Sequence, residues 1–183
     1  MPVARLVRDS SVLIVVDMQQ RLLPAMHNAQ AVTDQVGKLI NGANALQVPV
    51  IVTEQHRKGL GLTVPELAES LKSAAGTYEK LAFSAFIEPV RRQIVELGAR
   101  SVVVSGIEAH VCVLQTCLDL VDSGLTVAVA TDGIGARRLS DQASAVQRMV
   151  QAGVVPTTVE SILLEWVGEA GGPSFKSILP IIR

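Results

Sequence analysis

One short stretch, SGIEAHVCVLQTCLDL at residues 105–120, places a cysteine where a run of valines gives way to a helical pattern. The first turn of a helix presents unpaired backbone N–H groups and the positive end of the helix dipole. Both stabilise a thiolate, which is the nucleophilic form of cysteine. Position and residue type therefore make Cys112 a candidate nucleophile, with Glu108 and His110 beside it.

A nucleophilic thiol also needs groups that move its proton and stabilise its charge, and two other strand-like runs end in such groups. Asp17 follows the apolar run SVLIVV, and Lys80 closes the short run TYEK. A carboxylate can take the thiol proton and later hand it to a leaving amine, and a neighbouring ammonium lowers the thiol pKa. N–H groups at the helix start could hold the oxyanion of a tetrahedral intermediate. Asp17, Lys80 and Cys112 are thus sufficient for acyl transfer through a thioester.

The elements that must bring these residues together alternate between strand-like and helical patterns. Strands are predicted at residues 11–18, 48–55, 78–80, 101–106 and 125–133, with a last one soon after residue 153. Helices are predicted at residues 32–46, 64–74, 88–98, 109–124, 140–153 and 174–183, and another helix follows the last strand and ends by residue 168. Residues 56–63 are predicted to form a loop. This alternation indicates βαβ units, hence a mostly parallel sheet with helices on both faces. In such sheets, sites form beyond the carboxyl ends of the strands, where the strand order reverses.

Size, composition and charge narrow the class of protein. The chain of 183 residues is 49% hydrophobic and lacks a repeat or linker that would divide it, so a single domain over residues 1–183 is expected. The formal net charge is −1 with scattered Lys and Arg, which gives no electrostatic support for a nucleic-acid or membrane partner. No run reaches the length of a membrane span, and the segment MPVARLVRDS lacks the pattern of a signal peptide. Cys112 and Cys117 point in different directions on one helix, so a reduced, cytoplasmic protein is expected.

Five segments together resemble the isochorismatase-like cysteine hydrolases, in that order and across most of the chain. They are LIVVDMQQRLL, TEQ, YEKLAFSAF, VVVSGIEAHVCVLQTCLDL and VAVATDGIGAR, and the match is closest to small isochorismatase-domain proteins. The resemblance implies an Asp-Lys-Cys triad at Asp17, Lys80 and Cys112. It also implies a three-layer α/β/α sandwich around a six-stranded parallel sheet of order 3-2-1-4-5-6. That order reverses between strands one and four, beside Asp17 and Cys112.

The resemblance further implies a cis peptide bond between Ile107 and Glu108. Its use would be to direct the backbone N–H of Glu108, together with that of Cys112, into an oxyanion hole. In this interpretation Glu108 contributes its backbone, and Cys112 attacks the substrate.

Two departures limit what carries over from the family. Nicotinamidases of this superfamily have a metal-binding Asp-x-His…His after the second strand, but here the segment TEQHRKGLG offers Glu54 and a single His56. A lone histidine is a poor metal site, so no metal is predicted. Isochorismatases proper cleave a vinyl ether without a nucleophilic cysteine, so the presence of Cys112 disfavours that reaction. No motif implies a cofactor.

Other polar and aromatic residues have structural as well as functional interpretations. Gln19 could orient Asp17 or bind substrate, Phe83 could line a pocket, and His110 could be a pocket wall or an ordinary helix residue. Cys117 is interpreted as a small core residue.

Three hypotheses follow. The first is a metal-independent hydrolase that attacks a small amide or related acyl C–N substrate through Cys112. The second is a redox-sensing or metabolite-binding protein without turnover, and the third is an inactive oligomeric scaffold. Retention of all three triad residues disfavours the third. The many valines and leucines, and the resemblance, predict a homo-oligomer, a dimer or larger.

Overall fold

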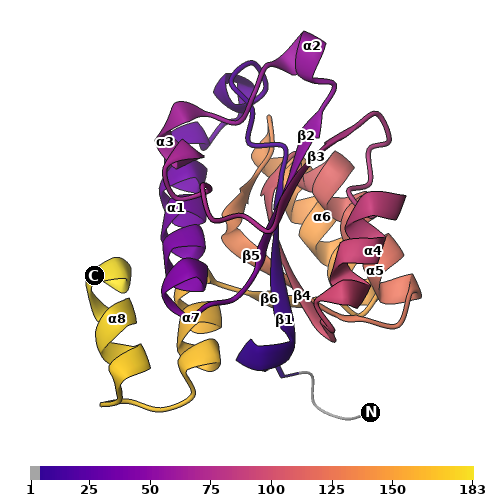
Figure 1. Cartoon of the computed structure of the whole chain (residues 1–183). Helices are drawn as coiled ribbons and strands as arrows, with labels where there is room; N and C mark the ends of the chain where they lie inside the picture. The colour runs from indigo at the N-terminus through magenta and orange to yellow at the C-terminus, as the bar shows by residue number, and fades with distance from the viewer. Residues whose placement is uncertain (1–4) are drawn as a thin grey trace.

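The computed structural model describes residues 5–183, and it forms a six-stranded sheet with helices on both faces (Figure 1). Residues 1–4, which belong to the segment considered above for a signal peptide, lie outside the described residues. The strands are β1 (Ser11–Val16), β2 (Val50–Gln55), β3 (Gly76–Lys80), β4 (Ser101–Ile107), β5 (Thr126–Gly135) and β6 (Val155–Thr157). Every strand pair is parallel and the order is β3-β2-β1-β4-β5-β6. The predicted fold class and strand order are confirmed.

Two helical layers cover the sheet, as the left and right sides of Figure 1 show. One layer contains α1 (Ala29–Ala45), α7 (Val159–Val167) and α8 (Pro173–Ile182); the other contains α4 (Glu88–Glu96), α5 (Leu114–Asp122) and α6 (Leu139–Gln151). Successive residues of β1 alternate between the two cores, with Leu13 and Val15 in one and Ile14 and Val16 in the other. A strand buried on both faces therefore carries the unbroken apolar run seen in the sequence.

The segment between β2 and β3 departs from prediction. Instead of a loop followed by a helix at 64–74, it has two single-turn helices, α2 (Arg57–Leu60) and α3 (Pro65–Ala68). The side-chain amide of Asn44 on α1 donates to the carbonyl of Ser70, and the Ser73 hydroxyl donates to the Asn44 amide oxygen. These contacts hold the chain in turns after α3, because a carbonyl needed by a longer helix is bonded to α1 instead.

The close approach of β1 and β4 determines how the two central strands end. Gly106, at the end of β4, has φ of 111°, and a Cβ atom there would lie 2.1 Å from the carbonyl oxygen of Val16. Only glycine accommodates both the positive φ and this contact. The residue that follows β1, Asp17, also has a positive φ, of 51°, so the chain has unusual backbone conformations at the ends of both strands. The chain thus turns sharply at the point where the strand order reverses.

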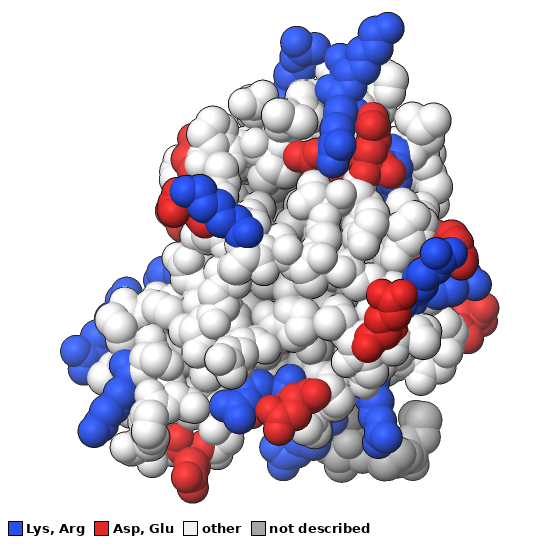
Figure 2. All heavy atoms as spheres, viewed as in Figure 1, with Lys and Arg blue, Asp and Glu red and all other residues white. Residues whose placement is uncertain are grey.

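Charged side chains lie mostly at the margin of the face in Figure 2, where groups of Lys and Arg alternate with Asp and Glu. On that face the basic groups form no continuous stripe, and the middle is uncharged. In residues 5–183, no helix is both long and apolar enough to cross a membrane. The cytoplasmic location stays a prediction.

The contact at Gly106 can be tested by adding a methyl group. We expect Gly106→Ala to lose more than about 3 kcal/mol of unfolding free energy, because strain at positive φ adds to a clash with a backbone atom that cannot rotate away. Gly98→Ala is the matched control: its φ is 63°, and a Cβ atom would meet nothing within 4 Å. It should lose only about 1–2 kcal/mol. Urea unfolding measures both, and equal losses would contradict the close contact.

Candidate active site

A buried ion pair lies at the carboxyl ends of β1 and β3. The Lys80 ammonium donates to Asp17 Oδ2 at 2.6 Å, and the Thr53 hydroxyl donates to Asp17 Oδ1 at 2.9 Å. The side chains of Asp17 and Lys80 have no exposed surface. Charges taken out of water in this way are stable only when paired and hydrogen-bonded, and both conditions are met here.

Lys80 has further acceptors around its ammonium group. It donates to the Gln55 side-chain oxygen at 2.7 Å and to the main-chain oxygens of Phe83 at 2.9 Å and Ala82 at 3.2 Å. With Asp17 this makes four acceptors for an ammonium that has three protons. Lys80 therefore also holds the segment that follows β3.

Cys112 lies in a π-helical turn, Ala109–Val113, between β4 and α5. The peptide bond between Ile107 and Glu108, at the end of β4, is cis. The Cys112 side chain is buried, and its thiol is within hydrogen-bonding reach of Asp17 and Lys80. The structure thus brings together three residues that the sequence placed at three separate strand ends.

The thiol is not a resting thiolate. Burial, and then the negative charge of Asp17, raise the pKa of Cys112 to about 12, although Lys80 acts in the opposite direction. The prediction of a lowered thiol pKa is therefore wrong. It counted the helix dipole and the lysine, but burial and the Asp17 charge outweigh them. Cys112 is therefore protonated near neutral pH, and it would have to lose its proton to act as a nucleophile.

Asp17 is placed to receive that proton. Burial raises the pKa of its carboxyl group above the ordinary value, against the opposing charge of Lys80 and hydrogen bonds from Lys80 and Thr53. A carboxylate with a raised pKa is a stronger base than one in water. The site can therefore move a proton from sulfur to carboxylate without solvent.

Gln19 holds a loop instead of touching the ion pair. Its side-chain nitrogen donates to the carbonyls of Gln55 and Gly61, and its side-chain oxygen accepts from the Gln55 N–H. Glu54 anchors the same loop by accepting from the N–H and hydroxyl of Thr63. With these bonds made, the Gln19 amide does not orient the Asp17 carboxylate, contrary to one of its predicted roles.

The remaining predicted residues, Glu108, His110 and Phe83, do not belong to the buried ion pair. His110 lines a recess of about 350 Å³ with Arg137, Arg138 and Asp141. Arg137 donates to the Glu108 carboxylate at 2.8 Å, so the Glu108 side chain has a structural partner, while the predicted role of its backbone N–H in an oxyanion hole stays a prediction. Sequence reasoning missed Arg137, whose only signal was the basic pair after the strand ending in GIGA. Phe83 is 54% exposed, on the segment that Lys80 holds.

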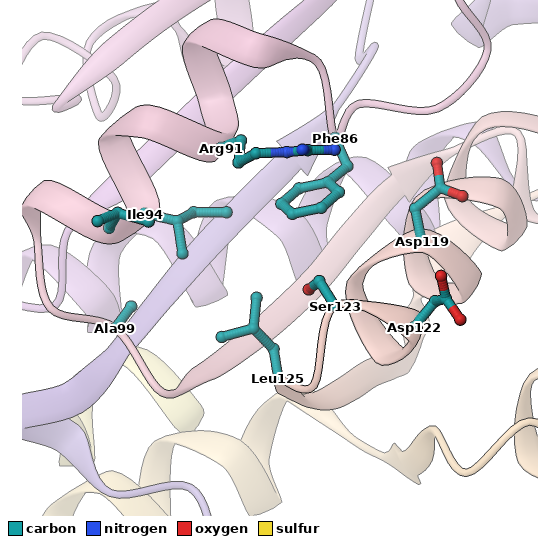
Figure 3. Close-up of a pocket in the computed structure, with 9 residues that line it drawn as sticks. Phe86, Arg91, Ile94, Ala99, Asp119, Asp122, Ser123 and Leu125 are labelled. Atoms are coloured by element: carbon teal, nitrogen blue, oxygen red, sulfur yellow. The ribbon is translucent and has the colours of Figure 1, made fainter.

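A separate groove of about 610 Å³ lies between α4 and α5 (Figure 3). Arg91 lies over the ring of Phe86, 4.8 Å from its centroid, and Asp119 and Asp122 stand on the opposite wall. No residue of the buried ion pair or its thiol lines this groove. Across residues 5–183, no three His, Cys, Asp or Glu side chains come together as a set of metal ligands.

Comparison with known proteins identifies the class that this fold and site define. Residues 11–161 match the family described as "Isochorismatase domain". The chain belongs to the isochorismatase family, whose fold is that of hydrolases, and the resemblance in the sequence is confirmed. It is 40% identical over 179 residues to isochorismatase domain-containing protein 1 of Salmo salar, covering 97% of this chain and 62% of that protein. The chain thus spans less than two thirds of that relative.

Solved structures agree with this assignment. The MAR1 ribonuclease of Caenorhabditis elegans is 38% identical with a TM-score of 0.94, covering 98% of this chain and 92% of that one. The ycaC gene product of Escherichia coli, an octameric hydrolase of unknown specificity, is 25% identical with a TM-score of 0.85, covering 98% and 93%. YcaC of Pseudomonas aeruginosa, solved with covalent acrylamide, has the same identity and TM-score, covering 97% and 91%.

Removing the Asp17 charge should make Cys112 more reactive. In Asp17→Asn the charge and hydrogen bond that raise the thiol pKa are lost while Lys80 remains, so the thiol pKa should fall and iodoacetamide should react at least tenfold faster at pH 7.5, as expected for about one pKa unit. Asparagine tolerates the positive φ of this position.

Peptide mass spectrometry measures the rate for each cysteine. Wild-type Cys112 should react ever faster as the pH rises from 6 to 9, without a plateau. Cys117, buried in the core with a pKa above the usual range, is the internal control and should stay unmodified in both proteins. An unchanged or slower rate in Asp17→Asn would contradict the assigned effect of Asp17.

Proposed function

We propose that this protein is a cysteine hydrolase that cleaves a small amide, or a related acyl C–N bond, through a thioester on Cys112. The observation that carries the proposal is the buried cluster in which one carboxylate, Asp17, is hydrogen-bonded to the Lys80 ammonium at 2.6 Å and lies close enough to the Cys112 thiol to raise its pKa. A thiol beside a base with a raised pKa becomes an activated nucleophile when the base accepts its proton.

The reaction divides into two halves. As Cys112 Sγ attacks the carbonyl carbon, Asp17 accepts the thiol proton, and the carbonyl oxygen becomes an oxyanion. The backbone N–H groups of Glu108 and Cys112, in the turn that carries the sulfur, are assigned to that oxyanion. Asp17 then gives its proton to the departing nitrogen, which leaves as ammonia or an amine. Water, deprotonated by Asp17, cleaves the thioester and regenerates the thiol.

Lys80 has an electrostatic part in this scheme. While Asp17 carries a negative charge, the ammonium balances it at 2.6 Å. When Asp17 is protonated, the positive charge of Lys80 stabilises the new negative charge on sulfur and oxygen. Because its protons are engaged by four acceptors, Lys80 is not assigned a proton-transfer step.

A neighbour supports a site that admits molecules of the size of a small amide to a nucleophile. YcaC of Pseudomonas aeruginosa, solved with covalent acrylamide, shares the fold with a TM-score of 0.85. Acrylamide is itself a small primary amide. We extend from that protein only the size and chemistry of the molecule, not the residue that it modifies.

Other readings have less support. A redox sensor needs an accessible thiolate of low pKa, whereas Cys112 is buried with a pKa of about 12. The names of three solved neighbours contain the word ribonuclease, but the formal net charge of −1 does not favour a nucleic-acid partner. The octameric neighbour supports assembly into a homo-oligomer.

The decisive experiment is a screen of small primary amides for ammonia release. Cys112→Ser and Asp17→Asn should each lower kcat/KM by a factor of about 10³ or more, because each acts in the chemical step. Cys117→Ala is the matched control, since Cys117 lies one turn further along the helix and takes no part in the reaction. Intact-mass spectrometry should find an acyl adduct that is lighter than protein plus amide by one ammonia.

Asp17→Asn gives two opposite readouts in this scheme: faster alkylation but lost turnover. Turnover that survives in Asp17→Asn would overturn the role of the carboxylate. The same screen should include RNA as a substrate. If no amide is hydrolysed and RNA is cleaved in a way that depends on Cys112, the amidase proposal is wrong and a nuclease function replaces it.

A further inference from the structure

A buried threonine connects the nucleophile to the segment after Lys80. Thr116 has no exposed surface and lies one helical turn beyond Cys112. Its hydroxyl donates to the Cys112 carbonyl at 2.6 Å and accepts from the Ala85 N–H at 2.7 Å. A hydroxyl is the smallest side-chain group that donates and accepts at once, so one atom links two chain segments.

The segment reached in this way, residues 81–87, is the one that Lys80 holds from its other end. The ammonium bonds the carbonyls of Ala82 and Phe83, and Thr116 bonds the N–H of Ala85. The side chains of Leu81 and Phe83 are 75% and 54% exposed, so packing restrains this part of the segment weakly. Its exposed part therefore depends on polar contacts, which include a bond from the Gln55 amide to the Leu81 carbonyl. At the other end, Ala85 is both bonded to Thr116 and buried in the core.

We infer that Thr116 is a positioning residue, which fixes the turn carrying Cys112 against the lysine segment and so holds the sulfur beside the Asp17–Lys80 pair. The inference rests on the proposed function in taking Cys112 as the nucleophile. The Thr116 hydroxyl is engaged by two main-chain groups, so Thr116 is assigned no reacting step and acts through the Cys112 carbonyl and the Ala85 N–H.

The physical consequence concerns the charge felt by the thiol. Lys80 favours the thiolate, against burial and Asp17. If the 81–87 segment loosens, the carbonyls that hold the ammonium loosen with it, and the favourable effect of Lys80 on the thiolate weakens. Loss of the Thr116 hydroxyl would cause this loosening, because it would leave the Ala85 N–H buried without an acceptor. A buried N–H without an acceptor is unfavourable, and the segment can relieve it by moving.

Thr116→Val and Thr116→Ser separate this role from packing. Valine has nearly the same shape but neither donates nor accepts, whereas serine keeps the hydroxyl and loses a methyl group. We expect acrylamide to modify Cys112 about tenfold more slowly in Thr116→Val between pH 6 and 9, corresponding to about one unit of thiol pKa. Thr116→Ser should react within about twofold of the wild type, although it has the less complete packing.

The two cysteines make the measurement self-controlled. Cys117 is buried beside Thr116, so its modification would report opening of the core. Hydrogen exchange of the Ala85 amide in the wild type provides a second test that needs no variant: protection is expected from the bond to Thr116, and exchange at the rate of an open loop would overturn the inference. So would equal rates in Thr116→Val and the wild type, or a Thr116→Ser as slow as Thr116→Val.

Neither measurement requires turnover. If the protein hydrolyses no amide but shows the expected order of acrylamide rates, the proposed function is wrong and the positioning role of Thr116 stands. If the protein hydrolyses amides but Thr116→Val matches the wild type in alkylation and in turnover, the proposed function stands and the positioning role is wrong.

Discussion

The buried pair of Asp17 and Lys80 is the interaction around which the rest of the site is built. Two opposite charges with no exposed surface need partners for every remaining lone pair and proton. The chain supplies these partners from two segments: the Thr53 hydroxyl and the Gln55 amide on β2, and two carbonyls after β3. The charge pair therefore determines how the chain is arranged beyond the ends of three neighbouring strands.

A steric constraint places the thiol next to that pair. Because Gly106 lacks a side chain, β4 can approach β1 closely enough for a Cβ atom to be excluded by the Val16 carbonyl. Asp17 directly follows Val16, and the turn with Cys112 begins three residues after Gly106. The close contact between the two backbones thus helps to bring the Asp17 carboxylate and the Cys112 thiol together, and it requires a residue without a Cβ atom at position 106.

The electrostatics of the site favour a proton transfer within it over a thiolate formed in advance. Low dielectric surroundings penalise a lone thiolate and a lone carboxylate alike, and one lysine can compensate only one negative charge. The cluster consequently has room for a single negative charge, which the Lys80 ammonium stabilises on Asp17. In the proposed reaction this charge passes to the substrate oxygen during attack. Such an arrangement protects the sulfur from oxidants in solution, because the thiol is both protonated and buried.

The sequence by itself determined the order of the elements, the both-faced burial of the central strands and the identity of Asp17, Lys80 and Cys112. These properties follow from the local hydrophobic pattern and from the residue types at strand ends, both of which can be read directly from the order of residues along the chain. Only the tertiary structure decided the protonation state of Cys112, the pairing of Glu108 with Arg137 and the contact of Thr116 with Ala85. Each of these depends on the distance between segments and on the exclusion of water. Neither quantity can be obtained from spacing along the chain, so the charge state of the thiol could not be predicted even though the thiol itself could.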